Sequence, residues 1–407
     1  MILLRSSLAA ALSLSVFAGI GRSQEPRRSL DLTVGGTGIS IGDSRRVRGL
    51  RLNFRDGQLE QATGVNATIW TPFKGGHGNI TGLALGLPAT GGQDVHGLQI
   101  AVFGAEVQGS FTGISIAGLG FGTGADASGF MVNGFGMGAG GWIRGVSLNG
   151  LGGGTGGNLE GVGVGGLGFG VGGSAKGVVI GGLGAGVGGD FTGFGVGAFG
   201  IGAGGRVDGL MIGGLGVGAG QGGSGALIGG LGAGVGGDYD GLLLGGLGAG
   251  VGGNLRGIAI TGLGTGVGGN ASGFFINLGG MGVGGTMRWV SINGLGAGAT
   301  RIEGLSATAG YLTTPHSVGV MAAGLWLRIR VWDDEPRDGS RDYEARFEGV
   351  GISTFNQVLG QQNGLTIGVV NFARSLNGVQ LGLINIVRDN PSGRKVLPVI
   401  NWGNTRR

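Results

Sequence analysis

Residues 174–189 read SAKGVVIGGLGAGVGG, and residues 238–253 read DYDGLLLGGLGAGVGG. They are two of thirteen copies of a sixteen-residue repeat that runs from Asp94 to Arg301 without insertion or deletion. The fourth position is Gly in twelve copies and Trp289 in the last, and the eleventh is Gly in all thirteen. The tenth is Leu or Phe in twelve copies, with Gly279 the exception. A fixed period of this kind indicates a repeat architecture in which each copy packs on its neighbours.

The apolar pattern changes phase inside each copy. Val178 and Ile180 share one parity, whereas Leu183 lies three residues beyond Ile180. Side chains alternate strictly along a strand, so one straight strand cannot place all of these residues on one face. We therefore expect two short strands per copy, joined at a Gly181–Gly182 corner. The expected core residues are Val178, Ile180, Leu183, Leu215, Leu231, Leu247 and Leu263.

Charged residues occupy only one part of the repeat. In copies two to thirteen nearly all of them fall in the first three positions, with Arg301 the exception, and the corner carries none. Each copy should therefore have one charged turn and one uncharged corner. Arrayed together, the corners would form an apolar rim opposite the charged turns. The predicted rim residues are Gly181, Gly182, Gly229, Gly230, Gly245 and Gly246.

The composition excludes several classes of protein. Of 407 residues 110 are Gly and only 7 are Pro, without a Gly-X-Y period, so collagen is excluded. A chain that is 41% hydrophobic and 12% charged is not a disordered tail. Frequent Gly disfavours long helices. With no Cys, the chain has neither disulfides nor Cys-ligated zinc. An all-β repeat protein is the class that remains.

Flanking segments suggest how the chain is divided. Residues 1–23 combine Arg5, an apolar stretch and small residues before Gln24, which is typical of a signal peptide. Residues 24–45 are expected to form a linker. A single repeat domain is expected over residues 46–407, with strict repeats at 94–301, a charged insertion at 327–347 and degenerate repeats at 348–402.

Two architectures fit these repeats, namely a closed array of antiparallel hairpins and a parallel β-solenoid. The closing segments NGVQLGLINI (377–386) and GRKVLPVINW (393–402) bear on the choice. They resemble the Asn-Gly-hydrophobic-x-hydrophobic-Gly repeats of uncharacterised glycine-rich bacterial surface-repeat proteins. That group is similar to families with the predicted β-flower fold, a shallow closed barrel of hairpins. The resemblance favours the closed antiparallel array over the β-solenoid and implies no catalytic residues.

No motif in the sequence predicts catalysis or cofactor binding. The G-x-G-x-x-G match at Gly163, Gly165 and Gly168 recurs in nearly every copy and lacks a strand–helix context. The histidines His77, His96 and His316 are isolated. We therefore expect no enzymatic activity, cofactor or metal. The net charge of +5 comes largely from terminal arginines, so we expect no nucleic-acid partner either.

These patterns favour a non-enzymatic exported protein of the bacterial cell envelope, located in the outer membrane, in the periplasm or at the cell surface. Its apolar rim would associate with membrane lipid or with a hydrophobic partner. The alternative is a structural or adhesive surface-repeat protein. The oligomeric state stays open.

Overall fold

The computed structural model of the protein describes residues 29–72, 76–331 and 345–404. Within them it has thirty-six β-strands and a single 3₁₀ turn, η3 (Ser392–Arg394). The predicted signal peptide lies outside the described residues. The chain divides into two compact units, Met1–Ala203 and Gly204–Arg407, where we predicted a single repeat domain. Each unit is described by itself.

Unit 1 consists of coils that each contain two strands. In the copy quoted first, β17 (Ala175–Gly181) is followed after a two-residue corner by β18 (Gly184–Val187). The long strands of the unit are β3 (Arg46–Asn53), β4 (Gln61–Thr68), β5 (Asn79–Gly86), β7 (Asp94–Ala101), β9 (Phe111–Ala117), β11 (Ala127–Asn133), β13 (Ile143–Asn149), β15 (Leu159–Gly165), β17 and β19 (Phe191–Gly197). The short strands are β6 (Ala89–Gly92), β8 (Gly104–Val107), β10 (Gly120–Thr123), β12 (Gly136–Ala139), β14 (Gly152–Thr155), β16 (Gly168–Val171), β18 and β20 (Gly200–Ala203).

Unit 2 repeats the same coil. Its long strands begin with β21 (Arg206–Gly213), β23 (Gly222–Gly229), β25 (Asp238–Gly245), β27 (Leu255–Thr261) and β29 (Ala271–Asn277). The short strands between them are β22 (Gly216–Ala219), β24 (Gly232–Val235), β26 (Gly248–Val251) and β28 (Gly264–Val267). Beyond them several strands lengthen, as β30 (Gly280–Asn293), β31 (Gly296–Thr308), β32 (Tyr311–Thr314), β33 (His316–Ile329), β34 (Arg346–Ile367), β35 (Val370–Val387) and β36 (Val396–Gly403). The predicted insertion at 327–347 falls largely on residues that are not described.

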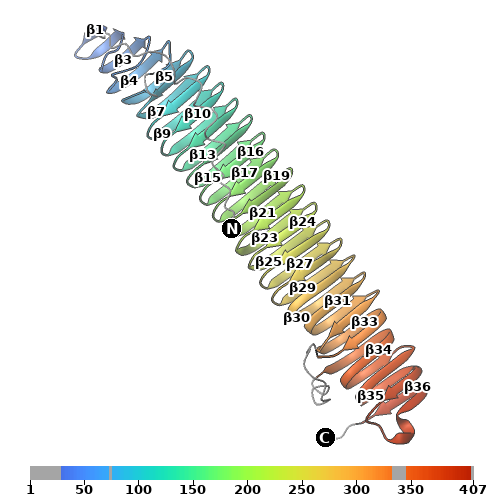
Figure 1. Cartoon of the computed structure of the whole chain (residues 1–407). Coiled ribbons are helices and arrows are strands. Elements are labelled where there is room, and N and C mark those ends of the chain that lie inside the picture. The colour runs from blue at the N-terminus through green and yellow to red at the C-terminus, as the bar shows by residue number, and fades with distance from the viewer. Residues whose placement is uncertain (1–28, 73–75, 332–344, 405–407) are drawn as a thin grey trace, which may run out of the picture. The chain divides into compact units, whose positions relative to one another are not determined.

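Equivalent strands of successive copies pair in parallel, sixteen residues apart. In unit 1, Val162 of β15 pairs with Val178 of β17, and in unit 2, Leu242 of β25 pairs with Ile258 of β27. Figure 1 shows these strands side by side within each unit. The long strands form one parallel sheet and the short strands another, which we call the long-strand sheet and the short-strand sheet. The all-β fold with two strands per copy is confirmed, and its architecture is the β-solenoid that we kept as the alternative.

Antiparallel pairing, expected between copies in the hairpin array, occurs in the described residues at two terminal strands. At the beginning, β1 (Leu30–Val34) pairs antiparallel with β2 (Thr37–Ile41), which continues in parallel onto β3. Both strands lie inside the segment that we predicted to be a linker. At the other end, β36 pairs antiparallel with β35.

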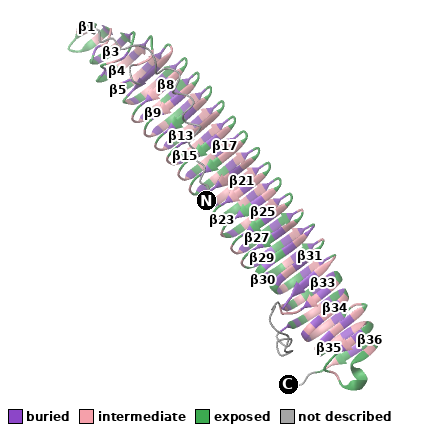
Figure 2. Cartoon of the chain, in the orientation of Figure 1, coloured by how far each residue is buried: buried purple, intermediate pink, exposed green. Residues whose placement is uncertain are grey.

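The core lies on the opposite face of the strands from the one we predicted. In the copy quoted second, Tyr239, Leu243, Ala249 and Val251 are buried, with exposures of 0%, 0%, 9% and 3%. They occupy the second, sixth, twelfth and fourteenth positions, so each coil directs these four residues inward. Figure 2 shows buried residues alternating with more exposed ones along the strands.

The predicted core residues are accordingly displaced from the core. Val178 and Ile180 are only half-buried on the outer side of β17. The predicted core leucines follow the corner and project outward. Their exposures are 44% for Leu183, 50% for Leu215, 48% for Leu231, 50% for Leu247 and 70% for Leu263. The prediction of burial at these leucines is wrong, because the corner turns the tenth position away from the space between the two sheets.

Glycine at the fourth position is required by the way the coils stack. Gly177 has φ +123°, a region that favours glycine, and a Cβ there would overlap the carbonyl oxygen of Gly161 in the preceding coil. Gly193 has φ +135° and stands in the same relation to Gly177. This glycine column fixes the spacing of the coils and the phase of the strand residues on either side.

Candidate apolar interaction surface

An exposed row of apolar side chains follows the uncharged corner in each unit. We call the tenth-position residues the corner ridge, and their exposures run from 40% to 70%. In unit 1 the ridge is formed by Phe103, Leu119, Phe135, Leu151, Leu167, Leu183 and Phe199. In unit 2 it is formed by Leu215, Leu231, Leu247, Leu263 and Leu295. Large apolar side chains that repeat at one exposed edge are typical of an interaction surface.

Backbone hydrogen bonds hold the ridge in a fixed geometry. The Leu183 N–H donates to the carbonyl oxygen of Leu167 at 2.7 Å. In unit 2 the Leu231 N–H donates to Leu215 at 2.7 Å, and Leu247 donates to Leu231 at the same distance. Each side chain therefore stands directly beside its equivalent in the next coil. A partner would meet a preformed surface whose backbone needs no ordering on binding.

The outer face of the long-strand sheet extends this surface. Residues at the fifth and seventh positions point outward and are exposed or half-buried, and we call them the outer columns. In unit 1 they are Leu98, Ile114, Phe130, Val146, Val162, Val178 and Phe194, with Ile100, Ile116, Val132, Leu148, Val164, Ile180 and Val196. In unit 2 they include Leu210, Leu242, Ile258, Phe274 and Val290, with Ile212, Ile228, Leu244, Ile260, Ile276 and Ile292. The outer columns and the corner ridge leave apolar side chains on both sides of the corner.

The predicted rim glycines shape the corner without supplying its apolar side chains. Gly182 is exposed and Gly181 is buried, and a Cβ on either would overlap a backbone carbonyl oxygen, of Gly166 and Gly184 respectively. The same holds in unit 2, where Gly230 and Gly246 are exposed while Gly229 and Gly245 are buried. The glycines make a tight turn possible, and the residue that follows carries the apolar surface.

The charged turn lies at the other end of the long strand, and side chains of its first position bond from one coil to the next. Asp126 accepts a hydrogen bond from the Trp142 N–H at 2.8 Å. Asp238 accepts from the Asn254 N–H at 2.6 Å, and Asn254 accepts from the Asn270 N–H at 2.8 Å. These polar residues therefore cap exposed backbone amides, a role that Asp, Asn and Ser side chains commonly take at turns.

Ion pairs at the same turn neutralise part of its charge. Arg144 lies 3.4 Å from Glu160, and Arg288 lies 2.8 Å from Glu303. Hydrogen bonds from Arg288 and Arg301 lower the pKa of the Glu303 carboxyl below its usual value. The turn is therefore a hydrated, charged edge of the long-strand sheet that contrasts with the apolar corner.

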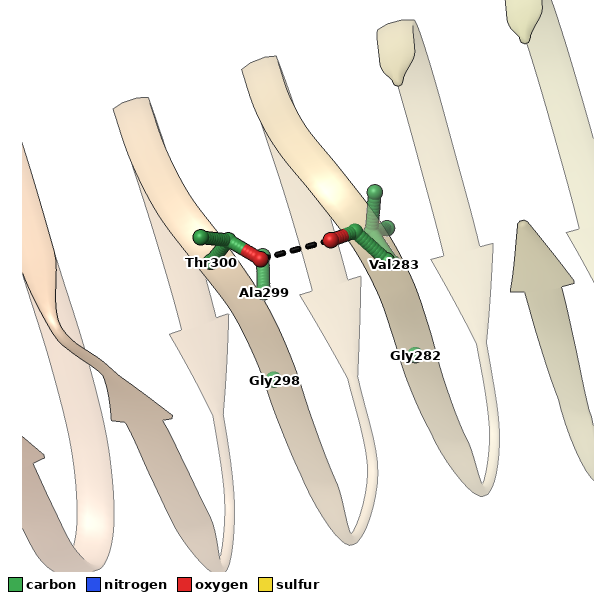
Figure 3. A pocket seen from close by; sticks show the side chains of 6 residues that line it. Gly282, Val283, Gly298, Ala299 and Thr300 are labelled. Carbon is green, nitrogen blue, oxygen red and sulfur yellow. Dashed lines mark hydrogen bonds between the residues drawn. The ribbon is translucent and has the colours of Figure 1, made fainter. Parts of the chain in front are cut away.

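The short-strand sheet presents glycine on its outer face and offers no reactive group. Figure 3 shows a shallow hollow of about 440 Å³ there, lined by Gly282, Val283, Gly284, Gly298, Ala299 and Thr300. The hollow exists because Gly282 and Gly298 lack side chains. Its one side-chain polar group, the Thr300 hydroxyl, donates to the Gly284 carbonyl oxygen at 2.5 Å. No titratable residue lines it.

Other residues singled out in the sequence are not assembled into a site. Ser115, Ser147 and Ser291 face the core with exposures of 0%, 0% and 1%, so solvent does not reach their hydroxyls. His96 is exposed and His316 is half-buried, in different units. Across the described ranges no three His, Asp or Glu residues are grouped so that they could hold a metal ion.

Sequence reasoning missed a buried charged cluster near the beginning of unit 1. The Arg51 guanidinium is 0% exposed and lies 3.0 Å from Asp43 and 3.1 Å from Asp56, and it donates to Asn66 at 2.8 Å. Burial raises the pKa of Asp56, an effect that the charge of Arg51 opposes. The available signal was the phase of Gly49, which places Arg51 at the sixth, inward position. The cluster fills the core and has no opening to solvent.

Comparison with protein-family models, curated proteins and solved structures finds no match to this chain. None of the helical structure in the described residues is long and apolar enough to cross a membrane.

Proposed function

We propose that this chain is a non-enzymatic exported protein of the bacterial cell envelope that associates with membrane lipid through its corner ridge. The repetitive β-solenoid is compatible with a structural surface-repeat protein. The observation that carries the finer proposal is the ridge itself, where leucines and phenylalanines in every strict coil but one are 40% to 70% exposed. Charged residues keep to the opposite turn, so a lipid surface that receives the corner need not desolvate them.

The size of the effect follows from the exposed surface. Burying a whole leucine side chain contributes about 1.5–3 kcal/mol, so a half-exposed ridge leucine contributes about 1 kcal/mol when lipid covers the rest. Two such residues correspond to about a thirtyfold change in partition. Aspartate at the same positions would oppose insertion further, because a carboxylate is costly to move into lipid.

The test compares two double variants with equal added charge. Leu231→Asp with Leu247→Asp alters the ridge, while Asn254→Asp with Asn270→Asp alters the charged turn and keeps the carboxyl oxygens that cap backbone amides. We expect the first pair to weaken binding to phosphatidylcholine vesicles at least thirtyfold and the second to leave it nearly unchanged. Aspartate at Gly229 is unsuitable, because its Cβ would overlap the Gly232 carbonyl oxygen.

If both double variants fold and bind vesicles as the parent does, the ridge has no part in lipid association. A structural or adhesive role would then be the better proposal. Folding of each variant is checked by circular dichroism and by the midpoint of urea unfolding.

A further inference from the structure

The last strict copy interrupts the glycine column with a tryptophan. Trp289 pairs with Gly273 on one side and with Gly304 on the other, at the position where other coils have glycine. Its φ is +83°, in the left-handed region that side chains rarely adopt. A bulky residue persists in such a conformation only when the surrounding structure or a functional constraint imposes it.

The indole receives little compensation from the chain itself. It is 71% exposed, although tryptophan is a residue that usually buries most of its surface. None of the ring–ring or cation–ring contacts within the described residues involves it. A strained backbone therefore holds a large apolar side chain out in solvent.

The surroundings of Trp289 are apolar on one side and charged on the other. Its neighbour Val290 belongs to an outer column, in register with Phe274 and Leu305, which are 39% and 42% exposed. Its other neighbour, Arg288, belongs to the charged turn and pairs with Glu303. The indole thus lies where the apolar outer face of the sheet meets the charged edge.

The charge of this region is positive. Residues 254–303 contain the three arginines Arg256, Arg288 and Arg301 and a single acid, Glu303, which leaves a net charge of +2. Lipid phosphates complement this charge, whereas the apolar outer columns suit the acyl chains beneath them. Tryptophan is enriched at the same boundary of a bilayer, because its ring is apolar and its N–H is a hydrogen-bond donor.

We propose that Trp289 is an interfacial anchor that holds the outer face of the long-strand sheet of unit 2 against a phospholipid bilayer. The anchor rests on the proposed lipid association and extends it from the corner ridge to the outer columns. The indole lies at the level of the headgroups, the arginines of the charged turn face lipid phosphates, and the outer columns contact the acyl chains.

The test restores the repeat pattern with Trp289→Gly. The melting temperature should equal or exceed that of the parent, because glycine relieves the backbone. Partition onto vesicles of phosphatidylcholine with a minority of phosphatidylglycerol should fall about tenfold, since most of an exposed indole surface no longer enters lipid. Quenching of the parent's tryptophan fluorescence by brominated lipid should also decrease in the variant.

The matched control is Trp142→Ser, which removes a tryptophan from the charged turn, where Arg144 lies 4.6 Å from the ring. Serine occupies the same repeat position at Ser110 and Ser174. This variant should bind vesicles as the parent does. If Trp289→Gly does not fold, Trp289→Asn replaces it, because asparagine also tolerates positive φ.

Two results would overturn the anchor. In the first, Trp289→Gly binds vesicles like the parent while the Leu231/Leu247 variant loses binding, which leaves the proposed function intact. In the second, the parent self-associates without binding vesicles and Trp289→Gly is monomeric, which makes a second copy the occupant. If the ridge variant and Trp289→Gly both bind fully, the anchor and the proposed function fail together.

Discussion

Replacing Leu243 by alanine should destabilise the protein far more than replacing Leu247, although both leucines belong to one coil. Leu243 is 0% exposed between the two sheets, so its truncation leaves a cavity and should lower the free energy of unfolding by about 3 kcal/mol. Leu247 is 50% exposed on the corner ridge, so its truncation should lower it by about 1 kcal/mol or less. Vesicle binding should show the reverse order, because only Leu247 can reach lipid.

The measurement is urea unfolding followed by circular dichroism, with the two variants compared at equal m-values. Equal m-values matter because coils of a repeat protein can unfold separately, which would confound a single free energy. Equal destabilisation by the two changes, or a larger effect at Leu247, would show that the inward and outward faces have been exchanged.

Three further predictions follow from single positions. Gly241→Ala should destabilise unit 2 strongly, since φ is +152° and a Cβ would overlap the preceding coil, whereas Gly250→Ala, with no atom within 4 Å of its Cβ, should change the unfolding midpoint very little. Burial raises the pKa of Asp56 above 3.8, so the folded state holds that proton more tightly than the unfolded state. The free energy of unfolding should therefore decrease as pH rises from about 3.8 through the folded pKa, and Asp56→Asn should remove this slope in pH-dependent urea titrations. If residues 1–23 are a signal peptide, N-terminal sequencing of envelope-associated protein should begin near Gln24, and an intact Met1 would contradict export.

The period, the number of strands per copy and the separation of charged turn from uncharged corner could all be predicted from the sequence, because each is a local property of sixteen residues. The inward face could not. Leu242, Leu243 and Leu244 are all apolar, so alternation along β25 gives no sign of which parity faces the core. The phase became clear only with the fourth-position glycine, whose positive φ sets the strand against the preceding coil.

The pairing of the copies and the charged core of unit 1 were beyond the sequence for a different reason. Parallel and antiparallel neighbours place the same apolar residues in contact, so the pattern within one copy does not distinguish them. The burial of Arg51 depends on partners that come from other parts of the chain, Asp43 and Asn66 among them. Trp289 was visible as a departure from the repeat, but its strain and exposure required the backbone geometry.

The open space above the short-strand sheet makes its outer face an unused template. At Gly122, Gly138 and Gly186 in unit 1, and at Gly234 and Gly266 in unit 2, an added Cβ would meet no atom within 4 Å. Single side chains could be written onto this face without disturbing the core, one per coil and about 4.8 Å apart, the distance between hydrogen-bonded strands. A linear array of chosen chemical groups with that pitch could therefore be engineered, or acquired in evolution, by point mutations alone.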